Sequence, residues 1–158
     1  MKIRKANPDD LETVFRITQQ TIRAVYPHYY PSGAVDFFAQ HHRTEAIRAD
    51  IADGIVYLLE DESGNAAGTV TLRKNEICRL FVLPDAQGNG YGRALLDFAE
   101  AEIAKQSDEI VLDASFSAKA IYIKRGYKEI AYHVIDTENG DHLCYDVMTK
   151  KYNRRKME

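Results

Sequence analysis

Hydrophobic and polar positions change period along the chain, and each change marks a predicted element. Lys2–Lys5 is typical of a short strand. The residues Asn7-Pro8-Asp9-Asp10 favour a helix start. Asn caps helices, Pro suits the first turn, and carboxylates suit the positive end of the helix dipole. From Leu11 to Val25 apolar side chains recur every three or four residues, which predicts a helix ending near Tyr26-Pro27. Two shorter helices are predicted at Pro31–Gln40 and Thr44–Ala52.

The rest of the chain alternates strands with helices. Turn sequences at Glu62–Asn65 and Lys74-Asn75 separate three strands that are expected to pair antiparallel. These strands are predicted at Gly54–Glu60, Ala66–Arg73 and Glu76–Leu83. The remaining predicted elements are a helix with a buried face from Leu95 to Ile103, a strand at Glu109–Asp113, a helix at Ser117–Arg125 capped by Gly126, and a closing hairpin of Tyr127–Asp136 and Asp141–Thr149.

Composition narrows the class of protein. A chain of 158 residues with 45% hydrophobic content fits one globular domain, expected over residues 1–150, and the basic residues 151–158 are interpreted as a solvated tail. A formal net charge of −3 argues against a nucleic-acid partner. No apolar leader is visible, and the run Ile55–Leu59 is too short to span a membrane, so a cytoplasmic protein with no membrane partner is expected. Cys78 and Cys144 are expected to be packed, reduced thiols.

The segment Glu76–Leu96 predicts a phosphate site. A strand is followed by a proline turn, a glycine-rich loop and a helix start, whose unpaired N–H groups and positive dipole end attract anions. A P-loop is excluded because Gly92 is not followed by Lys and Ser or Thr. A dinucleotide-binding turn fits poorly: Arg93 stands where its third glycine would be, although Asp113 is placed for a ribose contact.

Two motifs resemble those of the GNAT superfamily of acyl-CoA-dependent N-acetyltransferases. The loop matches Q-x-x-G-x-G through Gln87, Gly90 and Gly92. A second signature, A-x-x-x-Y-x-K-x-G-F/Y, follows about 30 residues later in the family's order. It is matched by Ala118, Tyr122, Lys124, Gly126 and Tyr127. Together with the element order, the resemblance implies an α/β fold with a mixed, mostly antiparallel central sheet of about seven strands, flanked by helices and splayed where the acyl-CoA enters.

The resemblance also implies which residues hold the cofactor, acetyl-CoA, with no metal. Backbone groups of Leu80, Phe81 and Val82 would hold the pantetheine arm as an added strand would be held. Ser115 stands where the family usually has Asn, so its contact to the cofactor has a shorter reach. The remaining implied cofactor contacts are Gln87, Gly88, Asn89, Gly90, Tyr91, Gly92, Arg93 and Tyr122.

Tyr122 and Glu76 are the candidate catalytic residues. In the family the matching tyrosine points at the cofactor sulfur as general acid or orienter, whereas the alternative here is an aromatic packed on the sheet. A glutamate at the spacing of Glu76 from Val82 takes the ammonium proton in the family, and the alternative is an exposed carboxylate at a strand end. Regular strand alternation would place Glu76, Cys78, Leu80 and Val82 on one face.

The acceptor side is predicted in the helical region before the first long strands. Tyr26, His28, Tyr29 and Tyr30 are the candidate contacts, together with Glu76. Phe37, Phe38, His41 and His42 crowd the same region. The histidines do not have metal-ligand spacing, because adjacent His41 and His42 do not face one ion comfortably on a helix.

The resemblance thus implies an enzyme that moves an acetyl group from acetyl-CoA directly to a primary amine of a small molecule or peptide. The alternative is a sensor or interaction module that binds acyl-CoA on the same fold without turnover, and a nucleotide-dependent oxidoreductase is a distant third. The sequence does not identify the amine, and it leaves open whether the protein forms a homodimer.

Overall fold

A seven-stranded mixed sheet forms the centre of the computed structural model, which describes residues 1–152, and it confirms the predicted fold class. Its strands lie in the order β1-β2-β3-β4-β5-β7-β6. All neighbouring strands pair antiparallel except β4 and β5. The bounds are β1 Lys2–Lys5, β2 Val56–Glu60, β3 Ala66–Arg73, β4 Glu76–Val82, β5 Glu109–Ala114, β6 Lys128–Asp136 and β7 His142–Lys151.

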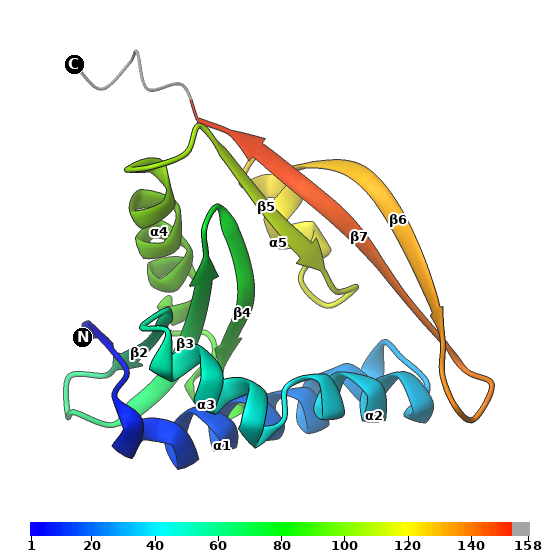
Figure 1. The fold of residues 1–158 in the computed structure, drawn as a ribbon, viewed down its shortest axis with the longest axis horizontal. Coiled ribbons are helices and arrows are strands. Elements are labelled where there is room, and N and C mark those ends of the chain that lie inside the picture. Colours follow the sequence, from blue (N-terminus) through cyan, green and yellow to red (C-terminus); the bar gives the residue numbers. More distant parts are fainter. Residues whose placement is uncertain (153–158) are drawn as a thin grey trace.

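The parallel pairing of β4 with β5 is very short. Only Glu76 with Val111 and Ile77 with Leu112 are paired, and beyond them the two strands diverge (Figure 1). The backbone of β4 from Cys78 to Val82 therefore has no strand partner on its β5 side. This is the splay that the sequence led us to expect.

Helices cover both faces of the sheet. The helices are α1 Leu11–Val25, α2 Ser32–His41, α3 Thr44–Ala52, α4 Tyr91–Ala104 and α5 Lys119–Lys124, with short 3-10 turns η1 Pro8–Asp10, η2 Tyr26–His28 and η3 Pro84–Ala86. Asn7 caps the first turn as predicted. Its side chain accepts a hydrogen bond from the Asp9 N–H, and the Asp10 carboxylate accepts one from the Asn7 N–H. One core packs α4 onto β3, β4 and β5, and a second packs α1, α2 and α3 onto the other face.

A bulge in β4 changes which residues share a face. Arg79 lies opposite Thr71 but Ile77 lies opposite Leu72, so Cys78 has no partner in β3. Ile77 consequently joins the core under α4, as Leu80 and Val82 do. Glu76, opposite Arg73, lies on the other face, so the prediction that it shares a face with Leu80 and Val82 is wrong.

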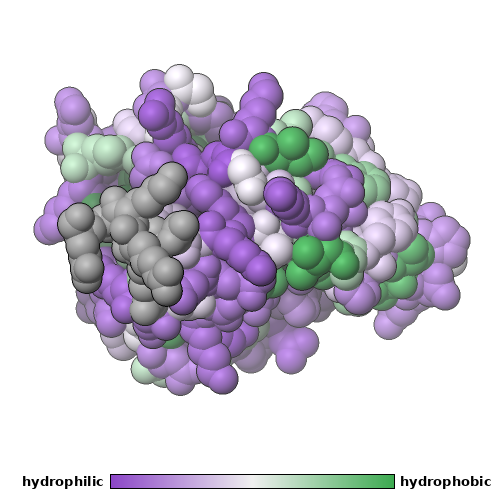
Figure 2. All heavy atoms as spheres, turned by 90° about the horizontal axis from the view of Figure 1, so that it is seen from above, coloured by the Kyte–Doolittle hydropathy of each residue, from purple (hydrophilic) through white to green (hydrophobic). Residues whose placement is uncertain are grey.

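The β6–β7 hairpin projects beyond the helical layers as a two-stranded ribbon (Figure 1). Its outer strand β6 is an edge, and almost all of its residues are exposed. Figure 2 shows hydrophobic surface gathered on this half of the molecule, where Ile121, Tyr132 and Val134 are exposed. A second bulge, between Glu129 and Ala131, interrupts this edge.

The C-terminal part of the sheet extends into the segment that was expected to be a tail. β7 continues to Lys151, and Tyr152 packs against the core under α4. The remaining basic residues of the expected tail lie outside the described residues. Within residues 1–152, no helix is long and apolar enough to cross a membrane.

A buried ion pair connects β4 to α3. Arg79 donates to Asp50 Oδ2 at 2.5 Å, and their side chains are 5% and 6% exposed. Arg73 donates to the other oxygen of Asp50 at 2.6 Å, and Arg79 also donates to Thr71. The central strand is therefore tied to the helical layer by charge as well as by apolar packing.

We expect Asp50→Asn to lower the free energy of unfolding by about 3 kcal/mol, because it leaves the buried Arg79 guanidinium without its counter-charge. The exposed pair of Arg23 with Asp36 is the control, and Asp36→Asn should change stability by less than about 1 kcal/mol. Urea denaturation of the two variants measures the difference. Equal losses would show that the Asp50 pair is as weak as a surface pair.

Candidate functional site

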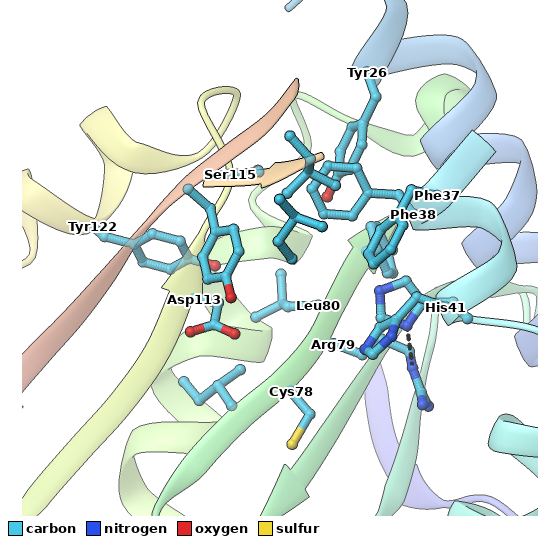
Figure 3. A pocket seen from close by; sticks show the side chains of 16 residues that line it. Tyr26, Phe37, Phe38, His41, Cys78, Arg79, Leu80, Asp113, Ser115 and Tyr122 are labelled. Atoms are coloured by element: carbon cyan, nitrogen blue, oxygen red, sulfur yellow. Dashed lines mark hydrogen bonds between the residues drawn. The ribbon is translucent and has the colours of Figure 1, made fainter. Parts of the chain in front are cut away.

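A cleft opens where β4 and β5 diverge (Figure 3). Its cavity volume is about 210 Å³, and its lining is mostly apolar with a few polar groups. Residues from both layers and from both halves of the sheet contribute. The lining residues are Tyr26, Phe37, Phe38, His41, His42, Ile77, Cys78, Arg79, Leu80, Phe81, Asp113, Ser115, Tyr122, Ile135, Leu143 and Tyr145.

Tyr122 lies at the wall of the cleft on α5. Its ring packs edge-on against Tyr127, with centroids 5.6 Å apart. Its hydroxyl makes no hydrogen bond with any residue in 1–152, and burial raises the pKa of this phenol. The group thus keeps its proton at neutral pH and is free to donate it to something in the cleft.

Tyr26 and Ser115 lie near the same point. Burial raises the pKa of the Tyr26 phenol, and a hydrogen bond with Ser115 partly opposes that rise. Tyr26 in turn contributes to raising the pKa of Tyr122, so the two hydroxyls face a common space. Ser115 Oγ also pairs with Ser117 Oγ at 2.9 Å. Three hydroxyl groups therefore meet at the divergence of β4 and β5.

Two carboxylates lie on the face of the sheet away from α4. Glu76 pairs with Val111 across the strand junction, and Asp113 follows on the same side of β5. Burial, and then the charge of Asp113, raise the pKa of Glu76. Partial burial raises the pKa of Asp113, and the charges of His133 and His41 partly oppose that rise. Asp113 lines the cleft and Glu76 does not.

Sequence reasoning missed Asp113 as a residue of this site. It was weighed only as a ribose ligand, because it follows the apolar run Ile110–Leu112. The available signal was its position at the end of a strand whose neighbour in the sheet, β4, leads into the glycine loop. That signal becomes specific only when β5 is known to pair with β4.

His42 is a neutral hydrogen-bond donor in this site. Arg79 Nε donates to His42 Nδ1 at 3.0 Å, so the ring proton must be on Nε2. Burial, and then the Arg79 charge, lower the pKa of His42 to about 3. Nε2 has no hydrogen-bond partner among residues 1–152. His42 can therefore donate a hydrogen bond from the cleft wall, but it cannot accept a proton near pH 7.

Cys78 is the unpaired residue of the β4 bulge and also lines the cleft. Its thiol approaches the carbonyl oxygen of Glu76 at 3.9 Å. Burial, and then the charge of Glu76, raise the pKa of this thiol to about 11. The sulfur is thus protonated at neutral pH and is a poor nucleophile. Both cysteines are free, as expected.

The glycine loop has the shape of an anion site. Gly88 and Gly90 have φ angles of +81° and +80°, a region that suits glycine, and no atom lies within 4 Å of where their Cβ would be. Gly90 precedes α4, which has no side-chain cap. The Gln87 side chain donates to the Val82 carbonyl at 3.1 Å and holds the loop to the strand end. The first N–H groups of α4 therefore lack a side-chain cap and are available to an anion.

The predicted acceptor residues separate into two groups. Tyr26 lines the cleft, but His28, Tyr29 and Tyr30 do not. Tyr29 is 51% exposed. Tyr30 is buried, where its hydroxyl donates to the Cys144 carbonyl and accepts from the Phe116 N–H, each at 2.9 Å. Among residues 1–152, no group of three His, Cys, Asp or Glu side chains is arranged to hold a metal ion.

The chain is similar in sequence and in fold to proteins of one family. A family model described as the acetyltransferase (GNAT) domain matches residues 25–152. A search of curated proteins finds no match. Among solved structures, the chain is similar to a GCN5-related N-acetyltransferase from Rhodopseudomonas palustris, with a TM-score of 0.85, 24% identity, and coverage of 95% of this chain and 94% of that one.

Two further solved structures share the fold at lower identity. The PaiA N-acetyltransferase of Thermoplasma acidophilum, in complex with coenzyme A, has a TM-score of 0.73 and 22% identity, with 96% of this chain and 98% of that one covered. The ribosomal-protein-S18-alanine N-acetyltransferase of Escherichia coli has a TM-score of 0.69 and 20% identity, with 96% and 94% covered. At these identities the likeness concerns the fold alone.

The low pKa of His42 predicts acid sensitivity. The unfolded chain binds the proton near pH 6.5 and the folded chain only near pH 3, so the stabilising contribution is complete above about pH 6.5 and is lost as pH falls toward 3. His42→Asn, which keeps an acceptor for Arg79, should reduce the slope of unfolding free energy against pH in this range by up to about 1.4 kcal/mol per pH unit. Denaturant titrations between pH 4 and pH 7 measure it, with His41→Asn as the control. An unchanged slope would contradict the buried, neutral state of His42.

Proposed function

Because the chain belongs to the GNAT acetyltransferase family, we propose that it transfers an acetyl group from acetyl-CoA directly to a primary amine. The observation that carries this proposal is the free hydroxyl of Tyr122 in the cleft between β4 and β5. A thioester placed there would lie between an acid on one wall and the Asp113 carboxylate on another. We infer that the acceptor is a small molecule or a peptide amine.

The donor side is proposed to run along β4 to the glycine loop. Backbone groups of Leu80, Phe81 and Val82 lack a strand partner toward β5, so the amides of a pantetheine arm can add to them as a strand would. The pyrophosphate would then meet the N–H groups at the start of α4. The loop residues proposed to surround it are Gln87, Gly88, Asn89, Gly90, Tyr91, Gly92 and Arg93, and Ser115 supplies a hydroxyl to the arm.

The reaction needs a neutral amine first. An ammonium acceptor would lose its proton to a carboxylate, and Asp113 faces the cleft while Glu76 lies beside it on the same face. The amine nitrogen then forms a bond to the thioester carbon, and the carbon–sulfur bond breaks. Tyr122 donates its proton to the leaving thiolate, and the proton that the attacking nitrogen loses as it becomes an amide restores the phenol. The raised pKa of Cys78, about 11, disfavours a route through an acetylated cysteine and so supports direct transfer.

Turnover separates this enzyme from the alternative, a module that binds acyl-CoA without reacting. We expect Tyr122→Phe to keep its fold and its thermal stabilisation by acetyl-CoA, because the ring packing is retained. Its kcat on the best amine of a primary-amine panel should fall by about 10² to 10⁴, as for other general acids. Wild-type kcat in this variant would assign Tyr122 to packing. Binding of acetyl-CoA without turnover by the wild type would support the sensor.

The carboxylates predict a pH dependence. With Asp113→Asn, deprotonation of the amine no longer has a nearby acceptor, so kcat/KM near pH 7 should fall by about 10² or more and recover as pH rises toward the pKa of the amine. Glu76→Gln should act in the same direction but less, because Glu76 does not line the cleft. Rate profiles of the wild type and both variants test this. A larger effect at Glu76 would make Glu76 the base, and two unchanged profiles would remove both.

A further inference from the structure

The tip of the β6–β7 hairpin is fastened to the start of α2. Asp141 Oδ2 accepts a hydrogen bond from the Gly33 N–H at 2.8 Å, across 108 residues of sequence. Asn139 Nδ2 also donates to Asp141 Oδ2, at 2.9 Å, which orients the carboxylate. In Figure 1 the hairpin loop comes down beside α2. We name this contact of Gly33 with Asn139 and Asp141 the hairpin–α2 latch.

Gly33 allows the two segments to touch. A Cβ at this position would lie 2.0 Å from Asn139 Oδ1 and 2.7 Å from Asp141 Oδ2, closer than side-chain carbons can approach. Gly33 is buried in the first turn of α2, where its N–H has no partner within the helix and is taken up by Asp141. Its presence there is explained by the close approach of the hairpin rather than by the needs of the helix.

A second fastening lies further along the hairpin. Tyr30, just before α2, donates to the Cys144 carbonyl of β7 and accepts from the Phe116 N–H. Its ring also stacks on Phe116, with centroids 4.9 Å apart and planes 10° from parallel. The hairpin is thus held to the helical layer at two points, one at the tip and one in the strand.

These fastenings join two walls of the cleft. Phe37, Phe38 and His41 come from α2, and Leu143 and Tyr145 come from β7. A polypeptide crossing between α2 and the hairpin would have to break the latch. The cavity volume of about 210 Å³ is also smaller than the roughly 300–1,000 Å³ of pockets for drug-sized ligands.

We propose that the hairpin–α2 latch closes the acceptor side of the cleft, so that the enzyme takes a small primary amine and excludes a polypeptide chain. This inference rests on the proposed acetyl transfer and adds the class of acceptor. The apolar walls would hold the carbon skeleton of the amine, and the Asp113 carboxylate would receive its charged end. The latch acts on access and leaves the donor side untouched.

The test compares small amines with a peptide in latch variants. Gly33→Ala introduces the clashing carbon while favouring the helix itself, and Asp141→Ala removes the acceptor of the Gly33 N–H. Glu138→Ala, in the same hairpin loop, is the matched control, because Glu138 makes no hydrogen bond or ion pair within residues 1–152. The probes are a panel of small primary amines and a short peptide with a free N-terminus and a lysine, each with acetyl-CoA.

We expect the wild type and Glu138→Ala to prefer the best small amine by kcat/KM. In both latch variants this preference over the peptide should fall about tenfold or more, mainly through a higher kcat/KM for the peptide, because the loss of a contact of hydrogen-bond strength opens its way to the cleft. Thermal stabilisation by acetyl-CoA should be unchanged. Preference of the wild type for the peptide, or an unchanged ratio in both variants, overturns the latch. Acetyl-CoA binding without transfer to any probe would instead overturn the proposed function.

Discussion

The short contact between β4 and β5 is the constraint on which the rest of this molecule depends. Two residue pairs join the strands, and everything beyond them diverges. A sheet that opens in this way would expose backbone groups and two apolar cores unless other elements held its halves apart and covered them. The helices and the hairpin hold the two halves in place and cover the apolar cores.

Each half of the open sheet is held by its own polar anchor. Arg79 on β4 is bound to Asp50 of α3 and touches His42, which fixes the strand that would carry the donor. On the other half, buried Glu100 of α4 receives Lys150 of β7 and Arg125 after α5. The Glu100 anchor lies outside the cleft lining, whereas Arg79 and His42 are part of that lining and bond to each other. Because these contacts hold both halves, the cleft can keep unpartnered hydroxyls such as Tyr122 without losing its shape.

The sequence was most informative where function depends on local backbone geometry. The glycine loop and the Asn7 cap followed from the local sequence, because each depends on residues that lie close together in the chain. The sequence was least informative where distant segments meet. Tyr30 was predicted to contact the acceptor but instead binds the Cys144 carbonyl. Asp113 was considered only as a ribose contact, because the pairing of β5 with β4 was not visible.

The extra residue in β4 has a consequence for how this strand can vary. Cys78 is the unpaired residue of the bulge between Ile77 and Arg79. Removing this residue would set Ile77 directly beside Arg79, as Leu72 follows Thr71 in β3, so the strand would pair regularly and Ile77 and Glu76 would keep their faces. The packing of β4 therefore does not need the extra residue. What it adds is a side chain in the cleft, because Cys78 is one of the lining residues. Related sequences that lack it should keep both faces of the strand and lose only this contact with the cleft.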